Sequence, residues 1–395
     1  MRKKTKLGTM SIGIRTPIIK DGDDLEKIVC ESVISSVKEN NLQLHDRDVI
    51  AVTEAVVGIS QGNYATLEQI AKDVKRKVKS KTLGLVFPIL SRNRFSLLLK
   101  AISQGVEKLV IQLSCPTDEV GNELVSRNQF FTSKLNPYSE VWTGEEFNKI
   151  FSHPVHPFTG INYIDLYKEY GGKNTEVIVS NNPEEILKYT DTVICADIHT
   201  REQTKQRLLD AGAKKVLTLC DIMNESVDGS GYNSKYGLLG SNKSTEDRVK
   251  LFPEHGQEFV EKVQKMMFEQ TGKKLEVMVY GDGAFKDPVG GIWELADPLV
   301  SPAYTEGLIG TPNELKLKFL SDNKFKNLRG SELQKAIKEE IRNKNSNLKG
   351  NMASQGTTPR RYVDLLGSLA DLTSGSGDKG TPVILIQNYF SNYAD

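Results

Sequence analysis

The first hundred residues alternate between strand-like and helix-like patterns of apolar positions. Residues 12–19 and the β-branched run at 48–57 predict strands. Apolar residues recur at helical spacing over 25–37, 67–78 and 94–102, and either Asp23 or Asp24 can cap the first of these helices. The alternation predicts a mixed α/β fold for this part of the chain.

The middle of the chain has the pattern of a parallel layer. Short apolar runs at 106–113, 176–180, 192–197 and 215–219 predict buried strands, and helices at 183–189 and 201–211 separate the last three. Strands that alternate with helices predict a βαβ-type layer. No GxGxxG motif follows any of these strands, which argues against a dehydrogenase of the NAD type.

The last third begins after a loop at 228–240 that is rich in Gly, Ser and Asn. Its apolar pattern predicts helices at 257–270, 312–320, 331–343 and 361–372, and strands at 274–280 and 383–388. We therefore expect an α/β fold of the mixed α+β kind for the whole chain.

Composition narrows the class of protein. The chain has 395 residues with 52 Lys and Arg against 51 Asp and Glu, so it lacks the basic excess of a nucleic-acid-binding surface. No apolar run is long enough to span a bilayer, and the basic tip at 2–6 is not followed by an apolar stretch, so we expect no secretory signal. We expect a soluble cytoplasmic protein without nucleic-acid or membrane partners. Its four cysteines form no CxxC pair, and we expect buried free thiols.

Two segments carry candidate phosphate and metal chemistry. Asn242, Lys243 and Ser244 lie in a small polar loop that can hold phosphates through backbone N–H groups and one point charge, although an ordinary polar loop has the same composition. Asp282 directly follows a strand and is flanked by glycines, so its carboxylate is placed to bind Mg²⁺, with Asp287 as a second ligand. A simple hairpin turn is the alternative for Asp282.

Two further segments near the C-terminus have the composition of anion-binding sites. The loop 374–380 includes Gly375 and Ser376, connects a helix to a strand and can wrap a phosphate. Arg360 and Arg361 offer forked donors that suit a carboxylate or a phosphate. A plain turn and a solvated helix start are the alternatives.

The order of these signals resembles the GTP-dependent γ-glutamyl ligases that act on coenzyme F-420. The stretch 17–25, Pro-Ile-Ile-Lys-Asp-Gly-Asp-Asp-Leu, is similar to the opening of that family, and 48–62 is similar to its next strand and turn. In the last third, 271–282 resembles the family's helix, Thr-Gly-Lys, strand and Asp segment, and 364–382 resembles its closing helix, loop and strand. At three positions the chain departs from the family pattern, with Ile59 for Lys, Gln61 for Glu and Ser376 for Glu.

The resemblance implies a division of the chain and a set of site residues. Residues 1–102 and 236–395 would build one ligase-like mixed-sheet scaffold, and 103–235 would form an inserted α/β region. Asp282 would bind Mg²⁺ or Mn²⁺, with a second carboxylate from Glu246, Asp247 or Asp287. The phosphates of GTP or ATP would be held by Asn242, Lys243, Ser244, Gly375 and Ser376. A substrate carboxylate would be clamped by Arg360 or Arg361.

The resemblance also implies a reaction. A small-molecule carboxylate acceptor would be activated as an acyl phosphate and joined to L-glutamate by a homodimeric enzyme. Two alternatives remain open. The same chemistry can act on a folate-like or other small carboxylate, and the scaffold can serve a non-catalytic nucleotide- or metabolite-binding protein.

Overall fold

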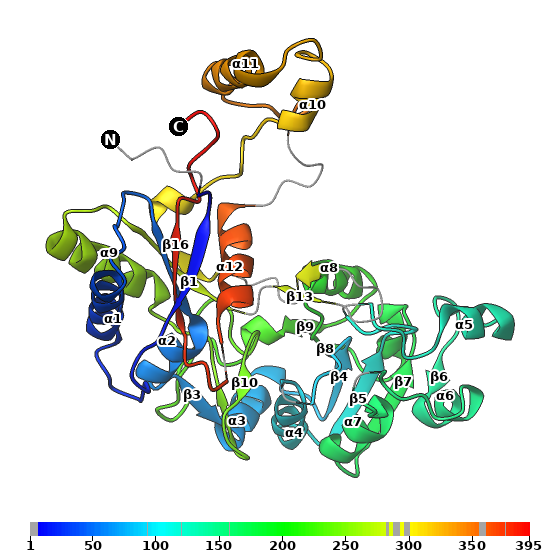
Figure 1. The fold of residues 1–395 in the computed structure, drawn as a ribbon. Helices are drawn as coiled ribbons and strands as arrows, with labels where there is room; N and C mark the ends of the chain where they lie inside the picture. The colour runs from blue at the N-terminus through cyan, green and yellow to red at the C-terminus, as the bar shows by residue number, and fades with distance from the viewer. Residues whose placement is uncertain are drawn as a thin grey trace.

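The computed structural model describes residues 7–92, 94–119, 121–157, 159–281, 284–286, 293–295, 301–354, 361–375 and 377–395. Four residues singled out from the sequence, Asp282, Asp287, Arg360 and Ser376, lie outside the described residues. The mixed α/β fold expected from the sequence is confirmed, and it is organised around two larger sheets (Figure 1).

The first sheet is built from both ends of the chain. Its strand order is β1 (Met10–Ile14), β16 (Val383–Gln387), β2 (Val49–Thr53), β12 (Glu276–Tyr280) and β15 (Ala303–Tyr304). Strands β2 and β12 run parallel, and the other neighbours are antiparallel.

Both faces of this sheet are covered by helices. Ile50 and Val52 of β2 pack with α1 (Leu25–Glu39) and α9 (Gly256–Thr271), whereas Val49 and Ala51 pack with α12 (Tyr362–Thr373). The alternation follows from the two-residue period of a strand. Helix α1 starts where expected, because the Asp24 carboxylate accepts a hydrogen bond from the Lys27 N–H at 3.1 Å.

The strand predicted over residues 48–57 is too long. Strand β2 ends at Thr53, and Glu54–Ser60 forms helix α2. Val57 is buried in helix α2, as it would also be in the predicted strand. A β-branched apolar run alone therefore does not distinguish a strand from the first turns of a buried helix.

The second sheet has the order β6 (Trp142–Thr143), β7 (Thr175–Val179), β5 (Lys108–Leu113), β4 (Thr82–Val86), β8 (Thr192–Cys195) and β9 (Lys215–Thr218). All neighbours are parallel except β6 and β7. The sheet thus includes β4, which precedes residue 103.

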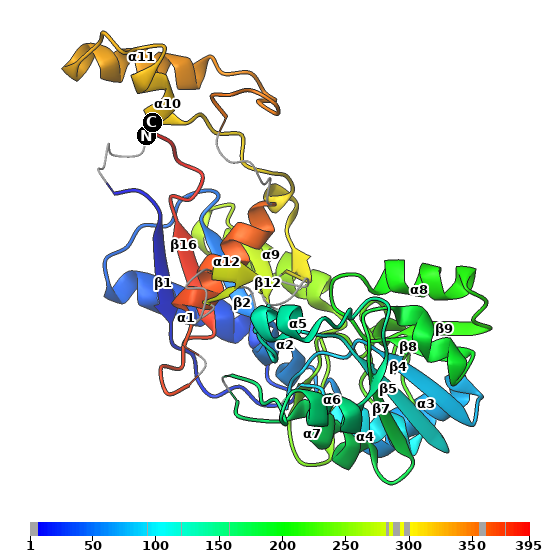
Figure 2. The same cartoon turned by 90° about the vertical axis from the view of Figure 1, so that its right-hand side faces the viewer.

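Helices cover the second sheet on both faces (Figures 1 and 2). One face packs against α3 (Leu67–Val78), α4 (Ser96–Gln104) and α7 (Tyr163–Gly171). The other packs against the 3-10 helix η1 (Pro183–Lys188) and α8 (Arg201–Asp210). Two short helices, α5 (Arg127–Ser133) and α6 (Gly144–Ile150), lie between β5 and β7 in the chain. This arrangement is the βαβ-type layer expected for the middle of the chain.

A small sheet connects the two parts. Its strands are β10 (Asn242–Lys243), β11 (Arg248–Lys250) and β3 (Tyr64–Thr66), with β11 in the centre. The 3-10 helix η2 (Leu219–Asp221) follows β9, and a separate hairpin pairs β13 (Ala284–Lys286) with β14 (Trp293–Leu295).

A helical extension lies between β15 and α12 in the chain. After the 3-10 helix η3 (Glu306–Leu308), helices α10 (Leu317–Asp322) and α11 (Gly330–Arg342) project away from the first sheet (Figures 1 and 2). Their small core includes Ile337, Ile341 and Ala394.

Two general predictions can be compared with the structure. All four cysteines are free, as expected, and Cys30, Cys115 and Cys195 are buried. Cys220, which was also expected to be buried, is only partly buried. Within the described residues, no helix combines the length and apolar character needed to cross a membrane.

Candidate functional site

The parallel strands β2 and β12 end at the same edge of the first sheet. Thr53 at the end of β2 is in register with Tyr280 at the end of β12. The next residues along the two strands are Glu54 and Gly281, and Asp282 follows. Carboxyl edges of parallel strands commonly carry binding sites in α/β proteins. This edge is therefore where we place the candidate site.

Glu54 is held at this edge by a buried ion pair. Lys250 Nζ lies 2.9 and 3.0 Å from the two Glu54 carboxylate oxygens. The two residues are only 7% and 8% exposed. Lys250 is the last residue of β11, so the pair connects the polar segment 242–250 directly to the end of β2.

Backbone packing brings the two elements of this pair together. Strand β11 lies between β10 and β3, and Lys250 is opposite both Asn242 and Tyr64. Gly58 of α2 allows the close approach, because a Cβ atom there would lie 3.1 Å from the Leu251 carbonyl oxygen. The sequence analysis missed both Glu54 and Lys250. The sequence feature that could have identified Glu54 is a charged residue directly after a β-branched run.

The expected phosphate and metal residues of segment 242–247 form a hairpin tip. Lys243 Nζ contacts the Glu246 carboxylate at 2.5 Å, and the Ser244 N–H donates to the Arg248 carbonyl at 2.9 Å. The Asp247 carboxylate accepts from the Thr245 hydroxyl at 2.7 Å. The structure thus gathers Asn242, Lys243, Ser244, Glu246 and Asp247 in one hairpin, where the polar contacts of Lys243, Ser244 and Asp247 are made to other residues of the same hairpin.

Arg361 begins helix α12. Its guanidinium donates to both oxygens of Asp364, at 3.0 and 2.7 Å, and this hydrogen bonding raises the pKa of Arg361. Both arms of the Arg361 guanidinium are therefore occupied by a residue of its own helix.

The loop after α12 closes on itself. The Gly375 N–H donates to the Thr381 hydroxyl at 2.8 Å, and a Cβ atom at Gly375 would lie 2.2 Å from the Lys379 side chain. Tyr280 lies close by, and burial raises its pKa to about 12. Among the described residues, no hydrogen bond or ion pair joins Gly375 or Arg361 to the hairpin tip.

The arrangement offers a buried cation and a carboxylate at one sheet edge. A Lys ammonium can neutralise phosphate charge, and a carboxylate can bind Mg²⁺ or accept a proton. Within the described part of the chain, no three His, Cys, Asp or Glu side chains form a cluster that could hold a metal ion. A metal site here would need Asp282 in addition to Glu54.

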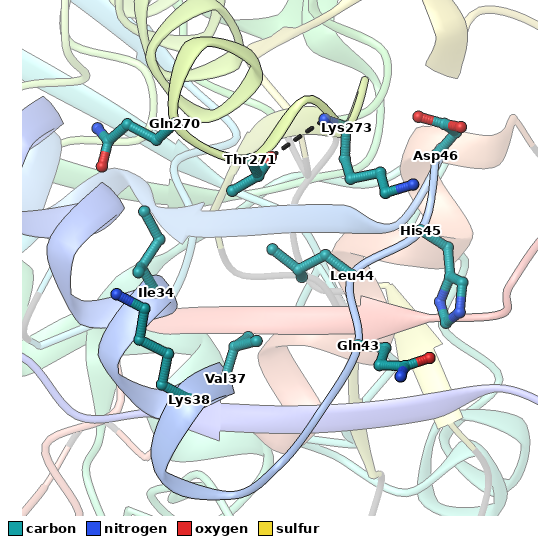
Figure 3. Close-up of a pocket in the computed structure, with 10 residues that line it drawn as sticks. All are labelled: Ile34, Val37, Lys38, Gln43, Leu44, His45, Asp46, Gln270, Thr271 and Lys273. Carbon is teal, nitrogen blue, oxygen red and sulfur yellow. Dashed lines mark hydrogen bonds between the residues drawn. The ribbon is translucent and has the colours of Figure 1, made fainter.

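A groove of about 1130 Å³ lies at the opposite edge of the same sheet (Figure 3). It is formed by the ends of α1 and α9 and by the loops before β2 and β12. Its lining residues are Ile34, Val37, Lys38, Gln43, Leu44, His45, Asp46, Gln270, Thr271 and Lys273. The groove therefore faces away from Glu54 and Lys250 and does not form part of the candidate site.

The fold and the candidate site together indicate the class of protein. Two chain ends build one mixed sheet around a parallel strand pair, and the edge of that pair holds buried charges suited to phosphate chemistry. Residues 13–388 match the family described as F420-0:Gamma-glutamyl ligase, so the chain belongs to that ligase family. A comparison with curated proteins finds no match.

Proposed function

We propose that this protein is a nucleotide-dependent γ-glutamyl ligase that joins L-glutamate to a small-molecule carboxylate. GTP or ATP would be the co-substrate, and Mg²⁺ or Mn²⁺ the cofactor. The main support is the buried pair of Glu54 and Lys250 at the carboxyl edge of β2 and β12, in a chain of a ligase family. A lysine ammonium in a buried, low-dielectric environment can stabilise the negative charge on the phosphoryl group in the transition state.

The proposed reaction has two steps. An acceptor carboxylate oxygen attacks the γ-phosphorus, the bond from that phosphorus to the β–γ bridging oxygen breaks, and an acyl phosphate and nucleoside diphosphate form. The glutamate amino group then attacks the acyl carbon. Phosphate leaves with the C–O electron pair, and the nitrogen loses a proton as the amide forms.

Each residue of the candidate site would have its own role in the reaction. Lys250 Nζ would donate to a phosphoryl oxygen, and Glu54 would accept the amine proton. Lys243 and Ser244 would contact the nucleotide, and Arg361 would bind a substrate carboxylate after releasing Asp364. Asp282 and Glu54 would hold the divalent cation, which neutralises phosphate charge when bound.

Phosphate release from GTP and ATP tests this proposal. Purified full chain is assayed with glutamate and with coenzyme F-420-0, a folate-type pterin or a simple carboxylate as acceptor. Release is expected only when glutamate and an acceptor are both present. Asp282→Asn and Lys250→Met should lower it roughly 100-fold, the loss expected for one transition-state contact. Lys81→Met changes an 84% exposed lysine and serves as the control.

Full metal-dependent activity in Asp282→Asn would contradict the assignment of that carboxylate as a metal ligand.

A non-catalytic nucleotide-binding protein is the second candidate function, and one observation favours it. Lys243, Glu246 and Arg361 already have partners within their own segments. Saturable nucleotide binding without phosphate release under any acceptor would support that alternative.

A further inference from the structure

The second sheet reverses its winding direction between β4 and β8. From β4 the chain proceeds outward to β5 and then β7, whereas β8 and β9 lie on the other side of β4. All five of these strands are parallel. Open α/β sheets bind ligands in the crevice at the carboxyl ends of the two strands that flank such a reversal. Here those ends are Val86 and Cys195.

Two helices on opposite faces of the sheet begin at this reversal. Helix α4 starts at Ser96, after the loop that follows β4, and α8 starts at Arg201, after the loop that follows β8. Neither helix has a side-chain cap among the described residues, whereas α3, α5, α6 and α7 of the same layer are each capped by a side chain. Uncapped N-termini leave N–H groups and a partial positive charge available to an anion.

The first residue of each helix carries a buried polar atom without a partner. Ser96 is 1% exposed, and its hydroxyl has no hydrogen-bond partner among the described residues. Arg201 Nε is likewise buried and unpartnered, although another nitrogen of the same guanidinium donates to the Ile198 carbonyl at 2.5 Å. Buried polar atoms are rarely left unpaired in folded proteins. Each of these two groups would be satisfied by an oxygen of a bound ligand.

Arg94 is a second cation at this edge, and it lines a small cavity there. Arg94 follows β4 and faces Ala196 and Ile198, which follow β8, and segment 238–241 closes the cavity. Its volume is about 30 Å³, which is enough for one water molecule. A phosphate group would therefore require segment 238–241 to move outward. That segment leads directly into β10 and the hairpin tip.

Two carboxylates also face this edge and oppose an anion. Glu119 accepts a hydrogen bond from the Leu90 N–H at 3.1 Å, and Asp197 accepts from the hydroxyls of Thr200 and Thr204. Burial raises the pKa of both carboxyl groups, and Asp118 adds to the effect on Glu119. Burial therefore disfavours the charged form of both carboxyl groups.

We propose that the carboxyl edge of the second sheet is a separate ligand site, where Arg94, Ser96 and Arg201 bind a phosphate group, free or esterified to a small molecule. This site goes beyond the proposed ligase reaction and does not depend on it. The ligase residues lie on the other sheet and on the β10–β11 hairpin.

Calorimetric titration of the full chain with inorganic phosphate, ribose 5-phosphate and AMP tests the site. Arg94→Gln and Ser96→Ala should each weaken binding roughly tenfold, the loss expected for one charge-assisted hydrogen bond. The matched controls are Arg127→Gln, at the start of the capped helix α5, and Ser103→Ala, in the last turn of α4.

Ser96→Ala separates a binding role from a structural one. Its hydroxyl has no partner in the fold, so its removal should leave the unfolding midpoint unchanged or raised while affinity falls. Equal affinity for inorganic phosphate and the esters would identify free phosphate as the ligand, and tighter binding of an ester would identify a phosphorylated small molecule. The site would be refuted if no probe binds saturably at millimolar concentration, or if both variants bind like their controls.

Discussion

Lys250 Nζ contacts both carboxylate oxygens of Glu54, although the two residues are 196 positions apart in the chain. The contact joins the start of α2 to the end of β11 and is almost fully buried. A buried charge without its partner is costly, whereas a buried pair roughly offsets its own desolvation. The pair therefore fixes the position of the hairpin relative to the parallel strands more than it stabilises the fold.

Glu54→Gln and Lys250→Met should each lower the free energy of unfolding by about 3 kcal/mol, because each removes the ion-pair partner of a buried charge. The double variant should be destabilised by less than the sum of the two. Urea unfolding of all four proteins measures the coupling. Additive losses would show that the two charges are independent in solution and would contradict the buried contact.

The hydroxyl of Tyr167 ties α7 to the loop after β4. It donates to the Ile89 carbonyl and accepts from the Ser91 N–H at 3.1 Å, and the residue is fully buried. Tyr167→Phe should cost about 2 kcal/mol, because both backbone groups lose their partner. Thermal unfolding checks this value. Tyr138→Phe, at a residue that is 71% exposed, is the control and should change little. Equal stability of the two variants would be inconsistent with the hydrogen bonds.

Glu119 should make stability depend on pH. Burial raises its folded-state pKa, so the folded protein binds more protons than the unfolded chain once the pH exceeds the usual pKa of a glutamate, about 4.3. Stability from this group is present below that pH and is lost as the pH rises toward the raised pKa. Glu119→Gln should remove this loss, so its stability relative to the parent should increase with pH. Urea unfolding between mildly acid and neutral pH measures the difference, and a constant difference would disprove the shift.

Gly240 precedes the candidate hairpin and has a positive φ of 77°. A Cβ atom there would lie 1.6 Å from the ring of Phe252. Gly240→Ala should cost about 3 kcal/mol or more, from left-handed strain and overpacking together. Gly350 has a similar φ of 81° with no neighbour near its missing Cβ, so Gly350→Ala should cost only about 1 kcal/mol. Comparable losses in the two variants, measured by chemical unfolding, would contradict the close contact with Phe252.

Local signals in the sequence predicted much of the fold. The Asp24 cap is a contact between residues three positions apart, and the strand predicted at 274–280, which ends in the apolar run 277–280, forms β12. Such features depend on neighbouring residues, which the sequence places together. The helix predicted at 312–320 instead forms over Leu317–Asp322, because Leu315 makes an isolated bridge with Ser354 rather than a helical turn.

The site was harder to predict because its contacts are distant in sequence. Lys250 carries no local sign that it will meet Glu54, and a lysine at the end of a short strand is most often solvated. Lys243 and Glu246 did lie together as expected, but close spacing also lets them pair with each other in the turn. The roles proposed for Asp282, Asp287, Arg360 and Ser376 remain predictions.

The small sheet of β10, β11 and β3 has a consequence for how such a chain can be assembled. Thr66 of β3 lies opposite Arg248 of β11, so the backbone leaves the small sheet after β3 and later returns to its side. The residues between β3 and β10, from Leu67 to Ser241, can thus be lengthened, shortened or exchanged for another module without separating the strands that build the first sheet and the hairpin.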